Sequence, residues 1–282
     1  MKNALVILIA ALPLSAQQAS APPAVLHIFR EDIKEGKGAA HEKTEAAFMQ
    51  AAAKANYPFH ILGLTAMTGT SQAWFLVGHA SFATIPEAET ALDRPEFALL
   101  DAADAQLRTG SLSMIARYRS DLSYAADKIN LPKMRFFSVE TVRVRPGQWD
   151  QYAELVKMLI AAQQKISDTQ PVATYQVMSG APNGTYLVME PTESLKSMDQ
   201  GPQRLQAIFQ AMGESGVKRY EKGVSEAIAS EESILFAVNA QMSYVPQEWI
   251  IADPEFWTPK PVTTTQAPAT TKTKRSGKTT SK

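Results

Sequence analysis

Apolar and polar positions follow one pattern twice along the chain, in residues 24–127 and again in 134–250. Each stretch opens with a run of β-forming residues, which predicts strands over 25–33 and 136–144. A glycine turn follows each run, and then a segment of about five turns with helical composition. In the second stretch an apolar stripe at helical spacing marks this helix: Trp149, Tyr152, Val156, Leu159 and Ile160. In the first stretch the stripe is weaker, but the alanine-rich sequence still favours helix.

Two strands, a second helix and a last strand complete each stretch. For the first stretch the pattern predicts them over 61–67, 73–79, 87–107 and 112–119. For the second it predicts them over 172–178, 185–189, 203–229 with breaks at glycines, and 234–242. Asn183-Gly184 is a hairpin signal between the two middle strands of the second stretch.

The two stretches align without a gap when the chain is shifted by 111 residues. Met67-Thr68-Gly69 then falls on Met178-Ser179-Gly180, although 25–82 holds only seven identities. A second anchor lies at a shift of 120, where Leu122-Ser123-Tyr124 meets Met242-Ser243-Tyr244. The nine-residue difference predicts an insertion in the second copy around 213–222.

The element order is therefore βαββαβ, twice, which is the ferredoxin-like arrangement with spatial strand order 4-1-3-2. One such unit covers only one face of its sheet with helices and leaves the other face apolar and bare. Two units remove this defect by packing sheet against sheet. We therefore predict an α+β protein in which two ferredoxin-like units, 24–127 and 134–250, form a closed intrachain α+β barrel around a cavity.

The amino-acid composition limits the kinds of catalysis and metal binding that are open to this protein. The 282 residues include 45% apolar and 20% charged residues, as expected for a globular protein with a core. There is no cysteine, which excludes thiol catalysis, disulfides, thiolate metal sites and a lipidated cysteine. The 28 basic and 28 acidic residues balance, but they are unevenly distributed along the chain.

The first residues predict export. Met1-Lys2-Asn3 precedes an apolar run of 11 residues, 4–14, which is too short to span a bilayer and fits a secretory signal. We expect cleavage after Ala16, giving a signal peptide over 1–16; cleavage after Ala21 is the alternative, although Pro22 would follow the cut. The mature protein is then periplasmic or secreted, with no transmembrane segment.

Residues 258–282 predict a disordered tail, with no acidic or aromatic residue and six Lys or Arg. Without these six and Lys2, residues 22–257 carry 21 basic against 28 acidic side chains. An acidic body thus bears a basic tail. The tail either contacts anionic surfaces or serves as a solubilising tether, and we expect no specific nucleic-acid binding.

The strand-then-glycine segments FREDIKEG, at 29–36, and ETVRVRPG, at 140–147, together with the strand end at His79-Ala80-Ser81-Phe82, resemble the dimeric α+β barrel superfamily. Within it, the chain looks close to the antibiotic-biosynthesis-monooxygenase and NIPSNAP-like families over residues 24–250. The resemblance implies a ligand cavity between the sheets. Members include cofactor-free monooxygenases, haem-degrading enzymes and proteins without known activity. Phe29 and His79 stand where haem-degrading members have an asparagine and a tryptophan, which argues against haem degradation.

All four histidines lie in the first copy. By the resemblance Phe29 and His79 face the cavity, and strand alternation then adds four side chains to that face: His27, Glu31, Phe75 and Val77. Two imidazoles and a carboxylate could bind a metal or haem iron or transfer protons, or they could be structural. No single element carries a metal-ligand spacing, so we predict no metal site, and any cofactor is unknown.

Other residues have less specific roles. Of Tyr118 and Arg119 one must face the cavity, and an inward Arg119 would attract an anionic ligand. We expect His41 to pack on the apolar stripe, His60 to lie at the surface and Trp74 to point towards the helices. The predicted ligand-binding set is His27, Phe29, Glu31, Phe75, His79 and Arg119.

Two functions fit these patterns. The first is an exported barrel that binds a small apolar or aromatic molecule, with oxidative chemistry like that of its relatives as one option. The second is a non-catalytic envelope scaffold held by its basic tail. No phosphate loop, nucleophile elbow or HExxH is present, so no catalytic residue is assigned. An open pocket lined by His27 and His79 would favour the first function, and a cavity filled by Phe, Met and Leu the second.

Overall fold

The computed structural model describes residues 21–258. The predicted signal peptide and, apart from Thr258, the basic tail lie outside the described residues. Within 21–258 no helix combines the length and the apolar character needed to cross a membrane.

Each copy contains the expected elements. Those of the first copy are β1 (Val25–Ile33), α1 (Gly38–Lys54), β2 (Ile61–Ala66), β3 (Gln72–His79), α2 (Ile85–Leu92), α3 (Pro95–Ala105) and β4 (Arg108–Tyr118). Those of the second are β5 (Phe136–Val144), α4 (Trp149–Lys165), β6 (Ala173–Ser179), β7 (Thr185–Thr192), α5 (Lys196–Asp199), α6 (Gly201–Ala227) and β8 (Ile228–Val238). Two short helices end the described chain, α7 (Gln247–Ala252) and α8 (Pro254–Trp257).

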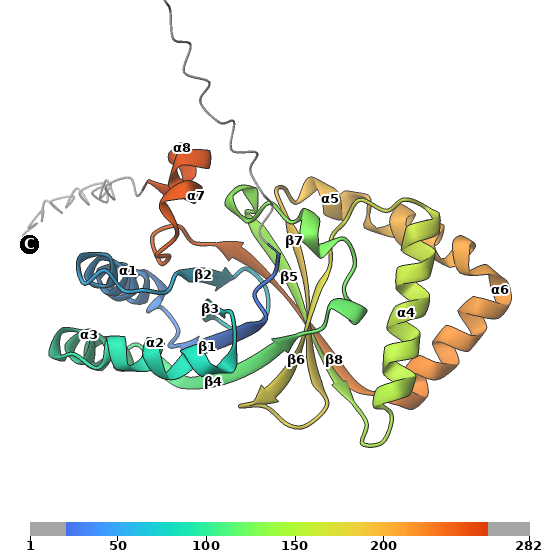
Figure 1. Ribbon diagram of the computed structural model, residues 1–282, viewed down its shortest axis with the longest axis horizontal. Coiled ribbons are helices and arrows are strands. Elements are labelled where there is room, and N and C mark those ends of the chain that lie inside the picture. Colours follow the sequence, from blue (N-terminus) through green and yellow to red (C-terminus); the bar gives the residue numbers. More distant parts are fainter. Residues whose placement is uncertain (1–20, 259–282) are drawn as a thin grey trace, which may run out of the picture.

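The strands form one closed antiparallel barrel in the order β1-β3-β2-β8-β5-β7-β6-β4. Each copy contributes four neighbouring strands in the predicted 4-1-3-2 order, and the copies join where β2 pairs with β8 and β4 with β6. Helices α1–α3 cover the outside of the first half, and α4 and α6 cover the opposite side (Figure 1). The predicted intrachain α+β barrel is confirmed.

The duplication extends to the hydrogen-bonding register. Strand β1 pairs with β4 as β5 pairs with β8, with the same irregularity before the last pair, Ile33↔Arg108 and Val144↔Ile228. The two anchors of the Ser-Tyr motif are also equivalent. Tyr124 bridges to Val172 at the start of β6, and Tyr244 bridges to Ile61 at the start of β2.

Two element predictions were wrong in detail. The predicted helix over 87–107 is two helices, because Pro95 holds Arg94 in an extended conformation and starts α3 afresh. Strands β4 and β8 begin earlier than predicted, at Arg108 and Ile228. Their first halves are polar and mostly exposed, so they lack the apolar alternation by which a strand is identified. The predicted break in the last helix is a kink in α6 at Gly213, where φ is 73°.

The barrel interior is filled by side chains from both copies. Trp74 of the first copy packs on Phe236 of the second, with ring centroids 5.2 Å apart. Leu64, Leu187 and Phe236 are fully buried in this interior cluster. Separate apolar clusters lie outside the barrel, between each half-sheet and its own helices. The sheet therefore has two buried faces, an interior one and one covered by helices.

Candidate functional site

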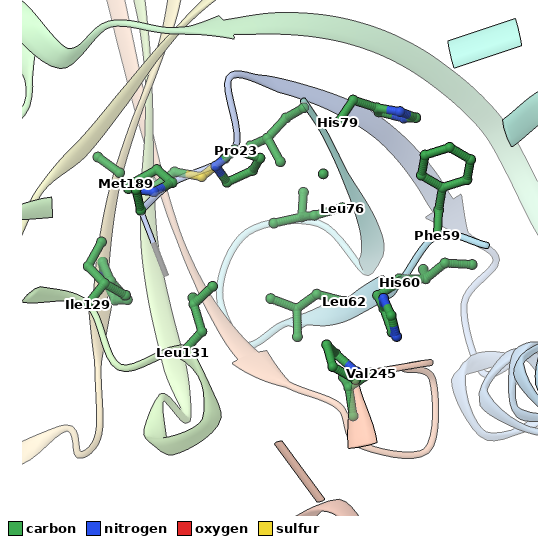
Figure 2. Close-up of a pocket in the computed structure, with 18 of the residues that line it drawn as sticks. Pro23, Phe59, His60, Leu62, Leu76, His79, Ile129, Leu131, Met189 and Val245 are labelled. Carbon is green, nitrogen blue, oxygen red and sulfur yellow. The ribbon is translucent and has the colours of Figure 1, made fainter. Parts of the chain in front are cut away.

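A cavity of about 400 Å³ opens at one end of the barrel, where β1, β2 and β6 begin. Its wall combines side chains of the two copies with others from the linker and from the segment after β8. In Figure 2, Leu62 and Leu76 of the first copy face Ile129, Leu131 and Met189 across the space. We call this space the barrel-mouth cavity.

The wall of the barrel-mouth cavity is mostly apolar. Phe137, Ala173 and Val245 continue the lining, and Pro22 and Pro23 lie at the rim. Tyr175 is a polar side chain in the wall, and its hydroxyl already donates to the carbonyl of Pro23 at 3.2 Å. The cavity can therefore exclude water from an uncharged ligand and offers few groups that would compensate a buried charge.

Most of the predicted site residues do share one face of the sheet. This face packs against the helices of the first copy and does not line the barrel interior. Phe75 and Phe29 belong to the cluster that packs under the helices of the first copy. The residues that alternate with them, among them Leu26, Ile28 and Leu76, line the barrel interior. The prediction that His27, Phe29, Glu31, Phe75 and His79 face the interior was therefore wrong.

The predictions for Trp74 and Arg119 were also wrong. Trp74 was expected to point towards the helices, yet it lies inside the barrel and its indole N–H donates to Gln72 at 2.7 Å. Tyr118 faces inward against Tyr175, with ring centroids 5.4 Å apart. Arg119 consequently points outward, where it pairs with Asp121 at 2.7 Å and does not join the other predicted residues.

His27 and His79 do lie together, with ring centroids 6.4 Å apart on the helix-covered face. His27 Nε2 is 2.7 Å from Ser113 Oγ, and His79 Nδ1 is 3.0 Å from Thr84 Oγ1. Burial lowers the pKa of both imidazoles, and each ring therefore favours its neutral form. Figure 2 places His79 at the edge of the barrel-mouth cavity beside Phe59, with its ring pointing away from the central space.

A buried polar cluster in the first copy escaped prediction. Glu31 of β1, His41 and Glu45 of α1 and Asp104 of α3 converge between sheet and helices, with Arg108 of β4 beside them. His41 Nε2 lies 2.8 Å from Glu31 Oε2 and is completely buried. His41 was expected to pack on an apolar stripe. Glu45 lies one helical turn after His41 on α1, and this second polar residue indicates in the sequence that this face of the helix is polar.

Comparison with known proteins supports the architecture. No protein-family model and no curated protein sequence matches the chain. Among solved structures, an anthrone oxidase-like protein superposes with a TM-score of 0.52 at 10% identity, covering 79% of this chain and 93% of its own. A candidate monooxygenase from Fusobacterium nucleatum gives 0.51 at 12% identity, covering 77% and 93%.

The fold is a ferredoxin-like α+β barrel. At 10–12% identity the similarity concerns the fold alone, and it carries no activity to this chain. Membership of the antibiotic-biosynthesis-monooxygenase or NIPSNAP-like family stays a prediction. The function of this chain therefore depends on the chemistry of its own sites.

The second copy has its own half-buried acid, Glu140, on the outer face of the barrel. Burial raises the pKa of Glu140 to about 7, and neighbouring carboxylates add to the shift. The ionisable groups that surround it come from two strands and two helices: Glu190, Glu231, Arg204, Tyr152 and Tyr220. Glu140 makes no hydrogen bond to another described side chain that would hold its charged form.

We expect Glu140→Gln to flatten the pH dependence of stability. In the unfolded chain this carboxyl titrates near its ordinary value of 4.5, and in the folded protein at about 7. Between these values the folded state keeps a proton that the unfolded state has lost, so stability falls as the pH rises. Urea unfolding between pH 4.5 and 7 should show the parent losing about 1–3 kcal/mol more than the variant. The exposed Glu154→Gln is the control and should follow the parent.

Proposed function

We propose that this protein binds a small, uncharged apolar or aromatic molecule in the barrel-mouth cavity. The observation that carries the proposal is a cavity of about 400 Å³ whose apolar wall is built jointly by both copies. A volume of this size is typical of small-molecule sites, which are mostly apolar with few polar groups. Tandem duplication brings the two halves of this wall together in one chain.

The proposal concerns binding rather than catalysis. Proton transfer needs titratable groups within hydrogen-bonding reach of the substrate. The imidazole of His79 points away from the central space, and Tyr175 is occupied by Pro23. His60 also lines the cavity, and its ring is stacked on Tyr244 with centroids 5.3 Å apart. The monooxygenase assignment of the structural relative supports small-molecule binding as a function of this fold, and export remains part of the proposal on the N-terminal sequence.

A fluorescence titration with 1-aminoanthracene, an uncharged aromatic fluorophore, tests the proposal. The parent protein should bind one probe per chain with an enhanced, blue-shifted emission. Leu62→Trp places a larger ring in the cavity and should weaken binding at least about tenfold, a change of about 1.4 kcal/mol. Leu99→Trp is the matched control, because Leu99 is 73% exposed on α3, and it should bind like the parent.

The filled barrel interior favours a second candidate function, a non-catalytic scaffold. Trp74, Phe137 and Phe236 close the centre of the barrel, which leaves only its mouth for a ligand. A parent protein that gives no probe binding, or a Leu62→Trp protein that binds as tightly as the parent, would leave the scaffold as the better account.

A further inference from the structure

The residues of the polar cluster in the first copy occupy positions whose equivalents in the second copy are uncharged core residues. The shift of 111 residues places Glu31, His41 and Glu45 on three apolar core residues: Val142, Tyr152 and Val156. The shift of 120 places Asp104 and Arg108 on Val224 and Ile228. The shared sheet register of Arg108 and Ile228 supports this equivalence. The fold therefore does not require charged residues at these positions.

The four side chains converge on one point. One ligand atom from each of Glu31, His41, Glu45 and Asp104 can be chosen so that all lie within 4.8 Å of one another. Their exposed fractions are 7%, 0%, 9% and 1% respectively. His41 Nε2 lies 2.8 Å from Glu31 Oε2 and 3.8 Å from Asp104 Oδ2. These positions come from β1, α1 and α3, so no single element shows the spacing.

Glu45 is the unexplained member of the cluster. Its side chain is directed at the other three, yet it forms no hydrogen bond or ion pair with any residue in 21–258. Asp104 Oδ2 likewise accepts no hydrogen bond from the described residues, although Arg108 Nε lies 3.1 Å away. A buried carboxylate without a partner is costly, which points to a missing positive charge.

The charge balance gives the size of that missing charge. Arg108 pairs with Glu31 and Asp104 and offsets one of the three carboxylates. Counting the three carboxylates and Arg108 alone, two negative charges remain when all acids are ionised.

We propose that Glu31, His41, Glu45 and Asp104 form a binding site for a divalent first-row transition ion, such as Mn²⁺ or Zn²⁺. One imidazole nitrogen with carboxylate oxygens suits these ions, whereas Ca²⁺ prefers oxygen alone and more of it. Binding would place the ion between His41 Nε2 and the three carboxylates, each in its deprotonated form, with any carboxyl proton released to solvent; the single ring proton of His41 then lies on Nδ1, so the imidazole stays neutral. Arg108 keeps the outer oxygens of Glu31 and Asp104 in place.

The site is accessible from a second cavity. A chamber of about 450 Å³ lies between the first half-sheet and its helices, and Glu31, Glu45 and Arg108 line it. Four phenylalanines contribute to its other walls, Phe29, Phe48, Phe75 and Phe97, together with aliphatic and polar side chains. An ion held here would therefore face a chamber with room for a ligand, separate from the barrel-mouth cavity.

The test is a metal titration of the tag-free, chelator-treated full chain, followed by calorimetry and by thermal unfolding. The parent should bind one equivalent of Mn²⁺ or Zn²⁺ and unfold at a higher temperature with metal than without. Glu45→Gln and His41→Gln should each weaken binding at least about tenfold and lose the metal-dependent rise. Glu42→Gln, on the same helix but outside the cluster, should match the parent.

Folding is controlled within the same experiment. Glutamine keeps the shape of Glu45 and removes its charge, so metal-free Glu45→Gln should unfold at or above the temperature of the metal-free parent. The proposal is overturned if the parent binds neither ion with a dissociation constant below about 100 µM, about 5.5 kcal/mol of binding free energy. It is equally overturned if a folded Glu45→Gln or His41→Gln protein binds metal as the parent does.

Discussion

Phe236→Ala is expected to lower the free energy of unfolding by about 3–5 kcal/mol, the range for removing a buried aromatic ring. Phe236 is fully buried and lies against Trp74 of the other copy, with ring centroids 5.2 Å apart. Truncation leaves a cavity between the two half-sheets of the barrel. Because the barrel is closed, the half-sheets cannot move together to fill this cavity. Urea unfolding at equilibrium measures the change.

The control for this prediction is Phe82→Ala, because Phe82 is 44% exposed and its loss should cost no more than about 0.5 kcal/mol. If the two half-sheets pack through the Trp74–Phe236 contact, the double variant Trp74→Ala/Phe236→Ala should lose less than the sum of the single variants. A loss below about 1 kcal/mol for Phe236→Ala would mean that the copies do not share a core.

Gly180→Ala should destabilise the protein by more than about 3 kcal/mol, because it combines backbone strain with a steric clash. Gly180 has φ of +89°, in the left-handed region that favours glycine. A Cβ there would lie 2.0 Å from the carbonyl oxygen of Ser113 on β4. The clash falls where β4 meets β6, one of the two junctions that close the barrel.

Gly147→Ala separates the two contributions. Gly147 has a similar φ of +81°, but a Cβ at this position meets no atom within 4 Å. It should therefore show only the conformational cost of about 1 kcal/mol. Chemical denaturation of both variants decides the matter. Equal losses for Gly147→Ala and Gly180→Ala would contradict the close β4–β6 junction.

Much of the architecture could be predicted from the sequence, because it rests on local patterns that occur twice. Residues related by the shift of 111 lie on equivalent strands of the two copies, and Tyr124 and Tyr244 form equivalent bridges. The repeated element order then leaves few ways to bury two bare sheet faces. Strand beginnings at Arg108 and Ile228 were missed because polar, exposed strand ends show no alternation.

The orientation of the sheet could not be predicted in the same way. Alternation correctly grouped Phe75 with Val77 and set Trp74 on the opposite face. Both faces are buried and apolar, one under helices and one inside the barrel, so composition does not distinguish them. The assignment of the inner face rested on a resemblance of low specificity, and it was inverted.

The polar cluster was missed for a different reason. His41 and Glu45 lie one turn apart on α1, a spacing equally compatible with an apolar stripe and a polar site. Asp104 and Arg108 lie more than fifty residues further along the chain, and only the tertiary structure joins them. Comparison of the two copies position by position would have marked the difference, since the second copy has Tyr152 and Val156 at the places of His41 and Glu45.

The central claim is that the barrel-mouth cavity takes an apolar ligand, and a crystal soaked in bromobenzene tests it most directly. The anomalous scattering of bromine locates the ligand without ambiguity about its orientation. We expect one ordered bromine peak between Leu62, Leu76 and Met189, in a cavity of about 400 Å³. An empty barrel mouth in crystals that take up bromobenzene elsewhere, or take up none, would contradict the account.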